Sequence, residues 1–222
     1  MFIGHLALGF AAKRAVPRAS LPMLFVAAQF ADVLWPVLVA LGIEQVRIDP
    51  GNTAFTPLDF VSYPYSHSLL LLIVWGTTLG LVRRALMRDG IRAAVVIGAL
   101  VVSHWVLDFV THRPDMPVYP GSAKFGLGLW NSIPATLAVE ASMYVVAVWL
   151  YVRATRARDW IGRWVFWALV VFLLVGYVAA VGAVPPSVPA LVLSALGGTV
   201  LLTFWSWWAD AHRAVRPLDV PK

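Results

Sequence analysis

The sequence predicts an all-α fold: a polytopic helical membrane protein with about six transmembrane helices and an N-terminal half-helix. The prediction depends on the apolar composition, on six apolar stretches long enough to cross a bilayer, and on positive charge confined to alternate loops. Of the 222 residues, 60% are hydrophobic and 13% are charged, and the mean hydropathy is +0.80. Soluble domains are about 45–50% apolar and about 25% charged, so this chain needs an apolar solvent. The composition also excludes intrinsic disorder, and the absence of cysteine excludes disulfides and thiolate metal sites.

Each apolar stretch covers roughly 20 residues, which is about 30 Å of helix and matches the core of a bilayer. The expected spans are 21–43, 66–88, 92–112, 133–152, 161–184 and 188–209. The earlier segment 2–12 is too short to span, and its charges follow the apolar run, which is the wrong order for a cleavable signal peptide. We therefore expect a half-helix packed among the spans. The long loops 44–65 and 113–132 are rich in Pro and Gly, and neither has the pattern of a strand pair.

Positive charge indicates the orientation. Only Arg47, Arg113 and Lys124 of the 17 lysines and arginines fall in the loops of one side. The other cations precede the first span, follow the last, or lie between spans two and three or four and five: Lys13, Arg14, Arg18, Arg83, Arg84, Arg88, Arg92, Arg153, Arg156, Arg158, Arg163, Arg213, Arg216 and Lys222. The positive-inside rule then places both termini in the cytoplasm and the protein in the cytoplasmic (inner) membrane. The net charge of +6 is thus explained by topology, and no nucleic-acid partner is expected.

The expected spans contain three acids, Asp32, Asp108 and Glu140, and no lysine or arginine except at their cytoplasmic ends. An ionised carboxylate is costly inside a membrane, so each must be protonated, paired or bound to a metal. Counting about 1.5 Å per residue puts these acids with His5, His67 and His104 in one band, roughly 12–24 Å from the nearest cytoplasmic charge. Spans five and six carry no such group. We therefore divide the single integral membrane domain into site-bearing helices, 1–152, and scaffolding helices, 153–222.

Span three carries the most informative pair. His104 and Asp108 are four residues apart, about 40° around a helix, and Thr111 falls on the same face. The two side chains can bind one ion, or Asp108 can orient His104, or the pair can form only an internal hydrogen bond. The sequence leaves open whether His112 turns into the site.

The other polar residues allow similar alternatives. Asp32 shares a face with Gln29 near Pro36, which is expected to open the backbone nearby. Asp32 can act functionally, or it can be protonated and hydrogen-bonded. His67 begins its span between Ser66 and Ser68, either of which can cap the helix or orient the imidazole. Glu140 can be a ligand, a general base or a protonated packing residue. Because clustered imidazoles and carboxylates without an internal cation are what a divalent metal satisfies, we expect a metal site.

The motifs H5-x-x-x-G9, S66-H-S-L69 and H104-x-x-L-D108-x-x-T111, with an Asp in the first long span, resemble those of the membrane-bound metal-dependent hydrolases, also described as LexA-binding inner-membrane hydrolases. The resemblance covers roughly residues 1–120. It implies a multi-pass bacterial protein with a divalent metal, and its motif style is similar to that of zinc-dependent phospholipase C. The metal ligands it implies are His5, Asp32, His67, His104 and Asp108. Members often carry a Pro-Asp-x-Asp cluster in the first span, where this chain has the single acid Asp32.

The favoured hypothesis is an intramembrane metal-dependent hydrolase that binds a divalent metal, with zinc as the expected ion and Glu140 or Asp32 as catalytic base. A site in the outer half of the bilayer lies level with lipid ester linkages, so the expected partners are membrane lipids and an amphiphilic small-molecule substrate with an ester or phosphoester bond. A proton-coupled transporter using the intramembrane Asp, Glu and His, and a non-catalytic membrane partner protein, are the alternatives. The oligomeric state is left open.

Overall fold

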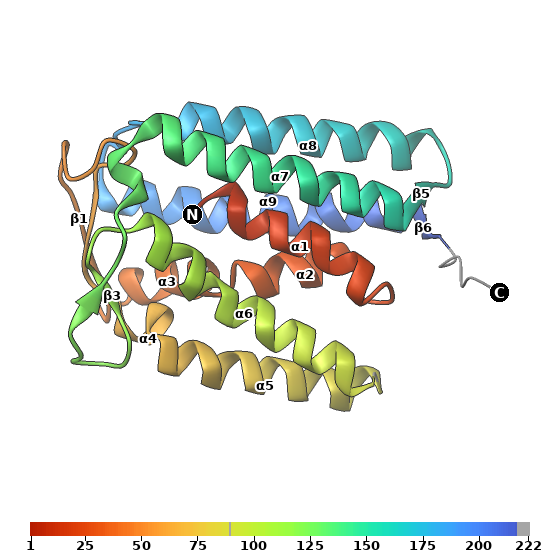
Figure 1. Cartoon of the computed structure of the whole chain (residues 1–222), viewed down its shortest axis with the longest axis horizontal. Helices are drawn as coiled ribbons and strands as arrows, with labels where there is room; N and C mark the ends of the chain where they lie inside the picture. The colour runs from red at the N-terminus through yellow and green to blue at the C-terminus, as the bar shows by residue number, and fades with distance from the viewer. Residues whose placement is uncertain (89, 217–222) are drawn as a thin grey trace.

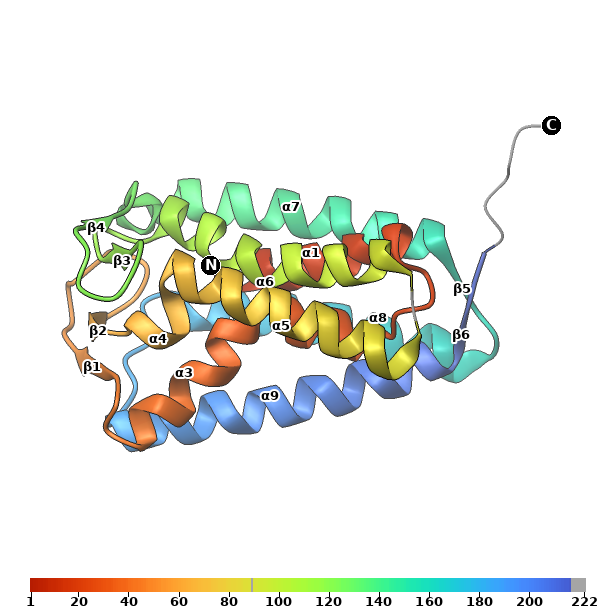
Figure 2. The same cartoon turned by 90° about the horizontal axis from the view of Figure 1, so that it is seen from below.

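Long helices lie side by side along the molecule and enclose a shorter one (Figures 1 and 2). The computed structural model describes residues 1–88 and 90–216, so Lys222, one of the cations counted above, lies outside the described residues. The helices are α1 (Ile3–Ala15), α2 (Leu21–Ala28), α3 (Phe30–Ala40), α4 (Pro64–His67), α5 (Leu69–Met87), α6 (Ile91–Thr111), η1 (Leu129–Asn131), α7 (Ile133–Ala154), α8 (Trp160–Ala180) and α9 (Val188–Ala211). The strands are β1 (Gln45–Ile48), β2 (Leu58–Ser62), β3 (Met116–Pro117), β4 (Lys124–Phe125), β5 (Thr155–Ala157) and β6 (Arg213–Val215).

The predicted all-α membrane fold is confirmed. Among the described residues, five helices, α5 to α9, are long and apolar enough to cross a membrane, and α2 with α3 makes a sixth such segment, bent by 60°. Their outward faces are apolar: α8 exposes Val171 and Val175, and α9 exposes Leu193, Val200 and Phe204. Such surfaces are unfavourable in water and suit a bilayer core, so the helices indicate a multi-pass membrane protein.

The first predicted span is broken, and not where the proline suggested. Pro36 lies inside α3, which continues to Ala40, whereas the helix is interrupted at Gln29 between α2 and α3. The second span is also interrupted, because Ser68 is extended and separates α4 from α5. Both interruptions lie close to candidate site residues, Asp32 and His67, and both leave backbone groups outside a regular helix.

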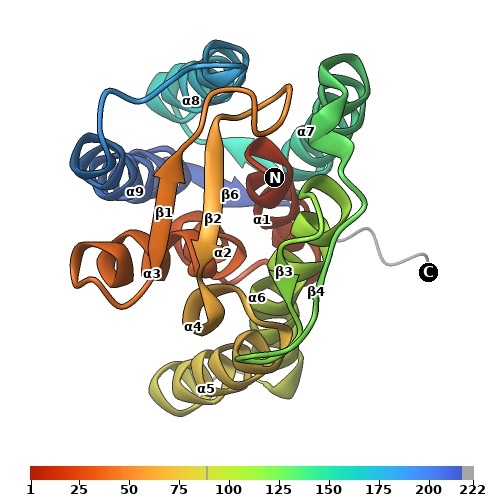
Figure 3. The same ribbon diagram turned by 90° about the vertical axis from the view of Figure 1, so that its left-hand side faces the viewer.

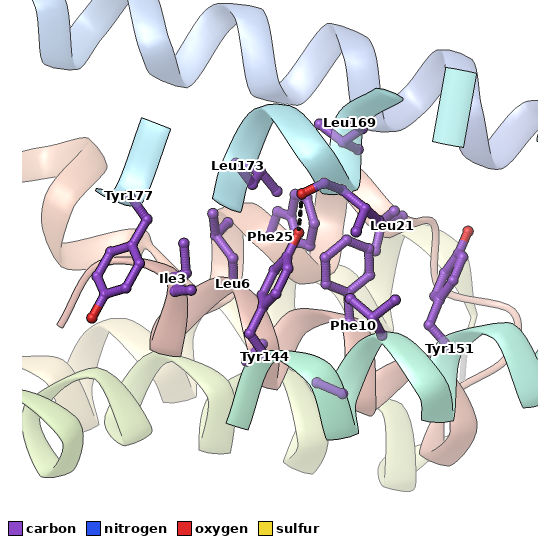
Figure 4. Close-up of a cluster of buried hydrophobic side chains, with 14 of the residues drawn as sticks. Ile3, Leu6, Phe10, Leu21, Phe25, Tyr144, Tyr151, Leu169, Leu173 and Tyr177 are labelled. Carbon is purple, nitrogen blue, oxygen red and sulfur yellow. Dashed lines mark hydrogen bonds between the residues drawn. The ribbon is translucent and has the colours of Figure 1, made fainter. Parts of the chain in front are cut away.

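The predicted half-helix is α1, and it occupies the middle of the bundle (Figure 3). It packs against α7, α2 and α6. Its Phe10 is fully buried and meets Phe25, Tyr144, Tyr151 and Phe166 edge to face with ring centroids 4.8–6.1 Å apart. Figure 4 shows this cluster, including the hydrogen bond that the Tyr144 hydroxyl donates to the Val170 carbonyl at 3.0 Å. The aromatic core thus fixes α1, and with it His5, relative to the spanning helices.

The expectation that loops 44–65 and 113–132 contain no strand pair is wrong. In each loop two short antiparallel strands pair, β1 with β2 and β3 with β4. The Pro- and Gly-rich parts form the turns, and the hairpins depend on tertiary contacts that sequence patterning does not show: Phe60 of β2 packs against Trp35, Tyr63, His112 and Trp130. We call the end of the bundle that carries these strands the hairpin end.

The opposite end carries β5 and β6, which pair with each other, and the α1–α2, α5–α6 and α7–α8 connections (Figure 2). These are the loops in which the sequence concentrates positive charge. Lys13 and Asp210 form a buried ion pair there at 2.8 Å, and Asp210 also accepts from the Tyr151 hydroxyl at 2.7 Å. Met1 is buried inside the bundle, and α1 runs from it toward this end.

Small residues allow α5 and α6 to touch through their backbones. A Cβ added to Gly80 would lie 2.5 Å from the Ala94 carbonyl oxygen, and one added to Gly76 would lie 2.7 Å from that of Gly98. Gly76 and Gly80 face Ala94 and Gly98, so each helix presents a small-x-x-x-small pair to the other, as is common where membrane helices pack closely.

Gly80→Ala should therefore destabilise the protein by about 1–3 kcal/mol, because the added methyl group forces the two helices apart. Thermal unfolding in detergent will detect this loss of stability, because each kcal/mol changes the Tm of a chain of this size by about 2–4 °C. Gly197→Ala is the matched control, since a Cβ there meets nothing within 4 Å. Equal stability of the two variants would contradict the close α5–α6 contact.

Candidate metal centre

Within the part of the chain that the structure describes, two overlapping groups of side chains could hold a metal ion: His5, His104 and Asp108, and Asp32, His67 and His104. Within each group the ligand atoms all lie within 4.8 Å of one another, and His104 belongs to both. The residues come from α1, α3, α4 and α6, which Figure 3 shows around the centre of the bundle. All five ligands that the family resemblance implies are therefore gathered in one place, although they span more than 100 positions of the sequence.

Asp108 is the centre of this arrangement, and its side chain is only 3% exposed. Its Oδ1 lies 3.0 Å from His5 Nε2, and its Oδ2 lies 3.2 Å from His104 Nε2 and 3.8 Å from His67 Nε2. Asp32 Oδ1 lies 3.5 Å from His67 Nε2 and 3.7 Å from His104 Nε2. Most of these separations are too long for hydrogen bonds. His5 Nε2 and the Met1 amino group pair with Asp108 Oδ1. The Nε2 atoms of His67 and His104, with Asp32 Oδ1 and Asp108 Oδ2, instead face a shared space.

His104 Nε2 is buried and has no hydrogen-bond partner among residues 1–88 and 90–216. Its other ring nitrogen, Nδ1, lies 2.9 Å from the Ala28 carbonyl oxygen. Because a carbonyl only accepts, Nδ1 carries a proton, and in the neutral ring Nε2 then presents its lone pair to Asp32 and Asp108. The Ala28 carbonyl is available because α2 ends at Ala28 and the chain bends at Gln29. A buried lone pair beside two carboxylates is what a cation in the shared space would satisfy.

Hydrogen bonds that run from Glu44 through Ser66, which we call the Glu44–Ser66–His67 relay, fix the His67 ring. The Ser66 hydroxyl donates to Glu44 Oε2 at 2.6 Å and lies 2.7 Å from His67 Nδ1. Since the hydroxyl proton is committed to Glu44, Ser66 accepts from Nδ1–H and His67 Nε2 is left with its lone pair toward the carboxylates. Glu44 Oε1 accepts from the backbone N–H groups of Tyr65 and Ser66 at 2.8 and 2.9 Å. Of the two serines, Ser66 orients the imidazole, whereas Ser68 caps α5.

His112 also turns toward the site. Its Nε2 lies 3.7 Å from Asp108 Oδ2, and its Nδ1 lies 2.9 Å from Asp115 Oδ1. Tyr63 donates its hydroxyl hydrogen to the same Asp115 oxygen at 2.7 Å. Burial, together with the Asp115 carboxylate, raises the pKa of Tyr63 well above its ordinary value, so the hydroxyl remains a donor. The pair Tyr63 and Asp115 thereby holds His112 at the edge of the cluster.

His5 is held from two sides. Its ring stacks on that of His104 with centroids 3.7 Å apart and an interplanar angle of 3°. Glu140 Oε2, on α7, accepts from the backbone N–H groups of Phe2 and Gly4 at 2.9 and 3.0 Å, which satisfies donors at the start of α1. Glu140 belongs to neither metal group. Its contacts are those of a residue that positions α1, and its role as a catalytic base stays a prediction.

Sequence reasoning missed Glu44, Asp115 and Tyr63, because a carboxylate or tyrosine in a polar loop is ordinary. The available signal was position: Glu44 and Asp115 each lie within three residues of the outer end of an expected span, level with the polar band. The Met1 amino nitrogen, which contacts Asp108 and lies 3.3 Å from Thr111 Oγ1, was likewise unforeseen. Thr111 itself lies on the His104–Asp108 face, as the helical spacing predicts.

Comparisons of this chain with protein-family models, with curated proteins and with solved structures gave no match. The resemblance to membrane-bound metal-dependent hydrolases therefore remains a hypothesis that depends on the motifs themselves.

Glu44→Gln should weaken metal binding about 10- to 100-fold, as the loss of outer-shell partners commonly does. The amide NH₂ can donate to Ser66 Oγ, which turns the Ser66 hydroxyl toward His67 Nδ1 and moves the imidazole proton to Nε2, where it blocks the ligand position. Competition of Zn²⁺ or Co²⁺ against a chelating dye measures the affinity. Asp159→Asn, which changes an exposed carboxylate at the other end of the bundle, is the control; an affinity for Glu44→Gln equal to that of the control would refute the relay.

Proposed function

We propose that the protein is an intramembrane metal-dependent hydrolase that acts on an amphiphilic ester or phosphoester. The observation that carries the proposal is the buried, unpartnered Nε2 of His104, which faces Asp32 and Asp108 beside two further imidazoles. Nitrogen and carboxylate ligands without thiolates suit zinc. When bound there, such an ion would acidify a water molecule and polarise the scissile carbonyl or phosphoryl oxygen, so no Ser or Cys nucleophile is needed.

The solvent exposure of the clustered side chains suggests which role each residue has. His5, His67, His104 and Asp108 have side chains at most 3% exposed, and we assign them to holding the metal. The Asp32 side chain is 40% exposed, so it is the member of the cluster that a substrate can reach. We assign Asp32 to binding or to accepting a proton from the attacking water. Glu140 Oε1 has no hydrogen-bond partner and is the second candidate for proton transfer.

The depth of the site supports a lipid-like substrate. His104 and Asp108 lie in the last two turns of α6, toward the hairpin end and within the apolar helices. The arginine- and lysine-rich loops lie at the opposite end, so under the positive-inside rule the hairpin end faces outward. The site would then lie near the ester linkages of the outer leaflet, and an amphiphile would reach it laterally from the bilayer.

Metal content provides the first check. Purified protein should carry about one equivalent of a divalent metal or take it up after addition, whereas His104→Ala/Asp108→Ala should retain less than about a tenth of an equivalent. His212→Ala serves as the histidine control, because His212 contacts Asp159 far from the cluster. Wild-type protein without metal, or a double variant with full metal content, would rule out the proposed site.

Activity provides the second check. Metal-loaded protein in mixed micelles should hydrolyse members of a panel of carboxylic-ester and phosphoester lipids, and chelation should abolish the reaction. Asp32→Asn should lower kcat by about 10²-fold or more, the range that a lost general base costs. Turnover that survives complete metal removal, or an Asp32→Asn variant as active as wild type, would contradict these roles.

A further inference from the structure

An apolar cleft lies beside the metal centre, between α1, α2 and α3 on one side and α8 and α9 on the other. Its volume is about 370 Å³, within the roughly 300–1,000 Å³ typical of small-molecule sites. Leu6, Phe25 and Leu173 line it, and Figure 4 shows these three side chains close together. Apolar cavities of this kind do not hold water well, so an apolar ligand is the expected occupant.

Asp32 connects the cleft to the metal centre. It lines the cleft and also belongs to the group with His67 and His104, and among the described residues it is the one that does both. The other members of the metal groups are buried, so the exposed part of Asp32 lies on the route between the cluster and the cleft. A ligand whose polar group reaches the metal centre past Asp32 would leave its apolar part in the cleft.

Two glycines leave the cleft open. Gly176 of α8 and Gly198 of α9 line it, and a Cβ added to either would meet nothing within 4 Å. They differ from Gly76 and Gly80, where an added Cβ would strike the backbone of α6. The glycines of the cleft therefore do not allow a close helix–helix contact. The lack of a side chain at these two positions leaves the cleft volume unfilled.

We propose that the cleft binds the alkyl chain of the amphiphilic substrate, with Gly198 and Gly176 setting how long a chain it accepts; this inference rests on the proposed hydrolase function. The occupant is one hydrocarbon chain of the molecule whose ester or phosphoester group reaches Asp32. The helices around the cleft support this assignment. Because α8 and α9 are apolar and of membrane-spanning length, a hydrocarbon chain can enter the cleft between them and α1–α3 directly from the bilayer. The helices expected to be scaffolding thus form one wall of the substrate site.

The test compares Gly198→Leu with Gly197→Leu, its matched control on the same helix. Gly197 is exposed and does not line the cleft, and it too has nothing within 4 Å of an added Cβ. Binding of a fluorescent single-chain lysophospholipid is measured in a steroid-based detergent without straight alkyl chains. Gly198→Leu should weaken binding about tenfold or more, the effect of excluding about two methylenes from an apolar site, and Gly197→Leu should bind as wild type. Thermal unfolding and metal content check folding, and Gly176→Leu repeats the test from α8.

Hydrolysis separates this inference from the proposed function. Gly198→Leu should reduce cleavage of long-chain esters by a larger factor than cleavage of a short-chain ester, whereas Gly197→Leu should leave both unchanged. Probe binding that is equal in Gly198→Leu, Gly176→Leu and wild type overturns the alkyl-chain site. In that case bilayer lipid, and not the substrate, occupies the cleft. If wild type cleaves no ester yet binds the probe in a Gly198-dependent way, the proposed function fails and the alkyl-chain site stands.

Discussion

A carboxylate buried among apolar helices must be satisfied by its immediate neighbours, because little water reaches it and the charged form is costly there. Asp108 is in this position, with imidazole nitrogens of His5 and His104 at 3.0 and 3.2 Å. The imidazoles of His104 and His67 are oriented from behind, that of His104 by the Ala28 carbonyl and that of His67 by Ser66 and Glu44. In their neutral forms the rings of His104 and His67 direct lone pairs, not protons, toward Asp32 and Asp108. This combination has an excess of electron donors that a divalent cation would balance.

The rest of the fold serves to bring these groups together. The bend at Gln29 both frees the Ala28 carbonyl and directs α3, with Asp32, toward His67. Glu140 holds the start of α1 through two backbone N–H groups, and the Phe10 cluster holds the middle of that helix. His5 lies between these two contacts and is therefore fixed in position. The hairpin end contributes Glu44, Asp115 and Tyr63. Interrupted helices and loops at one end of the bundle therefore build the site, and the continuous helices hold it in an apolar medium.

Much of this could be predicted from the sequence, and what could not has a physical reason. The spans and the shared face of His104, Asp108 and Thr111 follow from hydropathy and from 3.6 residues per turn, both local properties. The band of acids and histidines followed from counting residues along helices. The break at Gln29, the two hairpins and the Glu44–Ser66–His67 relay could not be predicted, because each depends on contacts between segments distant in sequence. The Pro36 position suggested a bend, but a proline inside a helix does not by itself decide where the helix breaks.

X-ray absorption spectroscopy of the zinc- or cobalt-loaded protein in detergent tests the central claim most directly. The account predicts a first shell of nitrogen and oxygen at about 2.0–2.2 Å, with outer-shell scattering from two or three imidazoles that is lost in His104→Ala. The His212→Ala spectrum should equal that of wild type. A shell of oxygen alone, or imidazole scattering that survives His104→Ala and disappears in His212→Ala, would place the metal elsewhere and contradict the account.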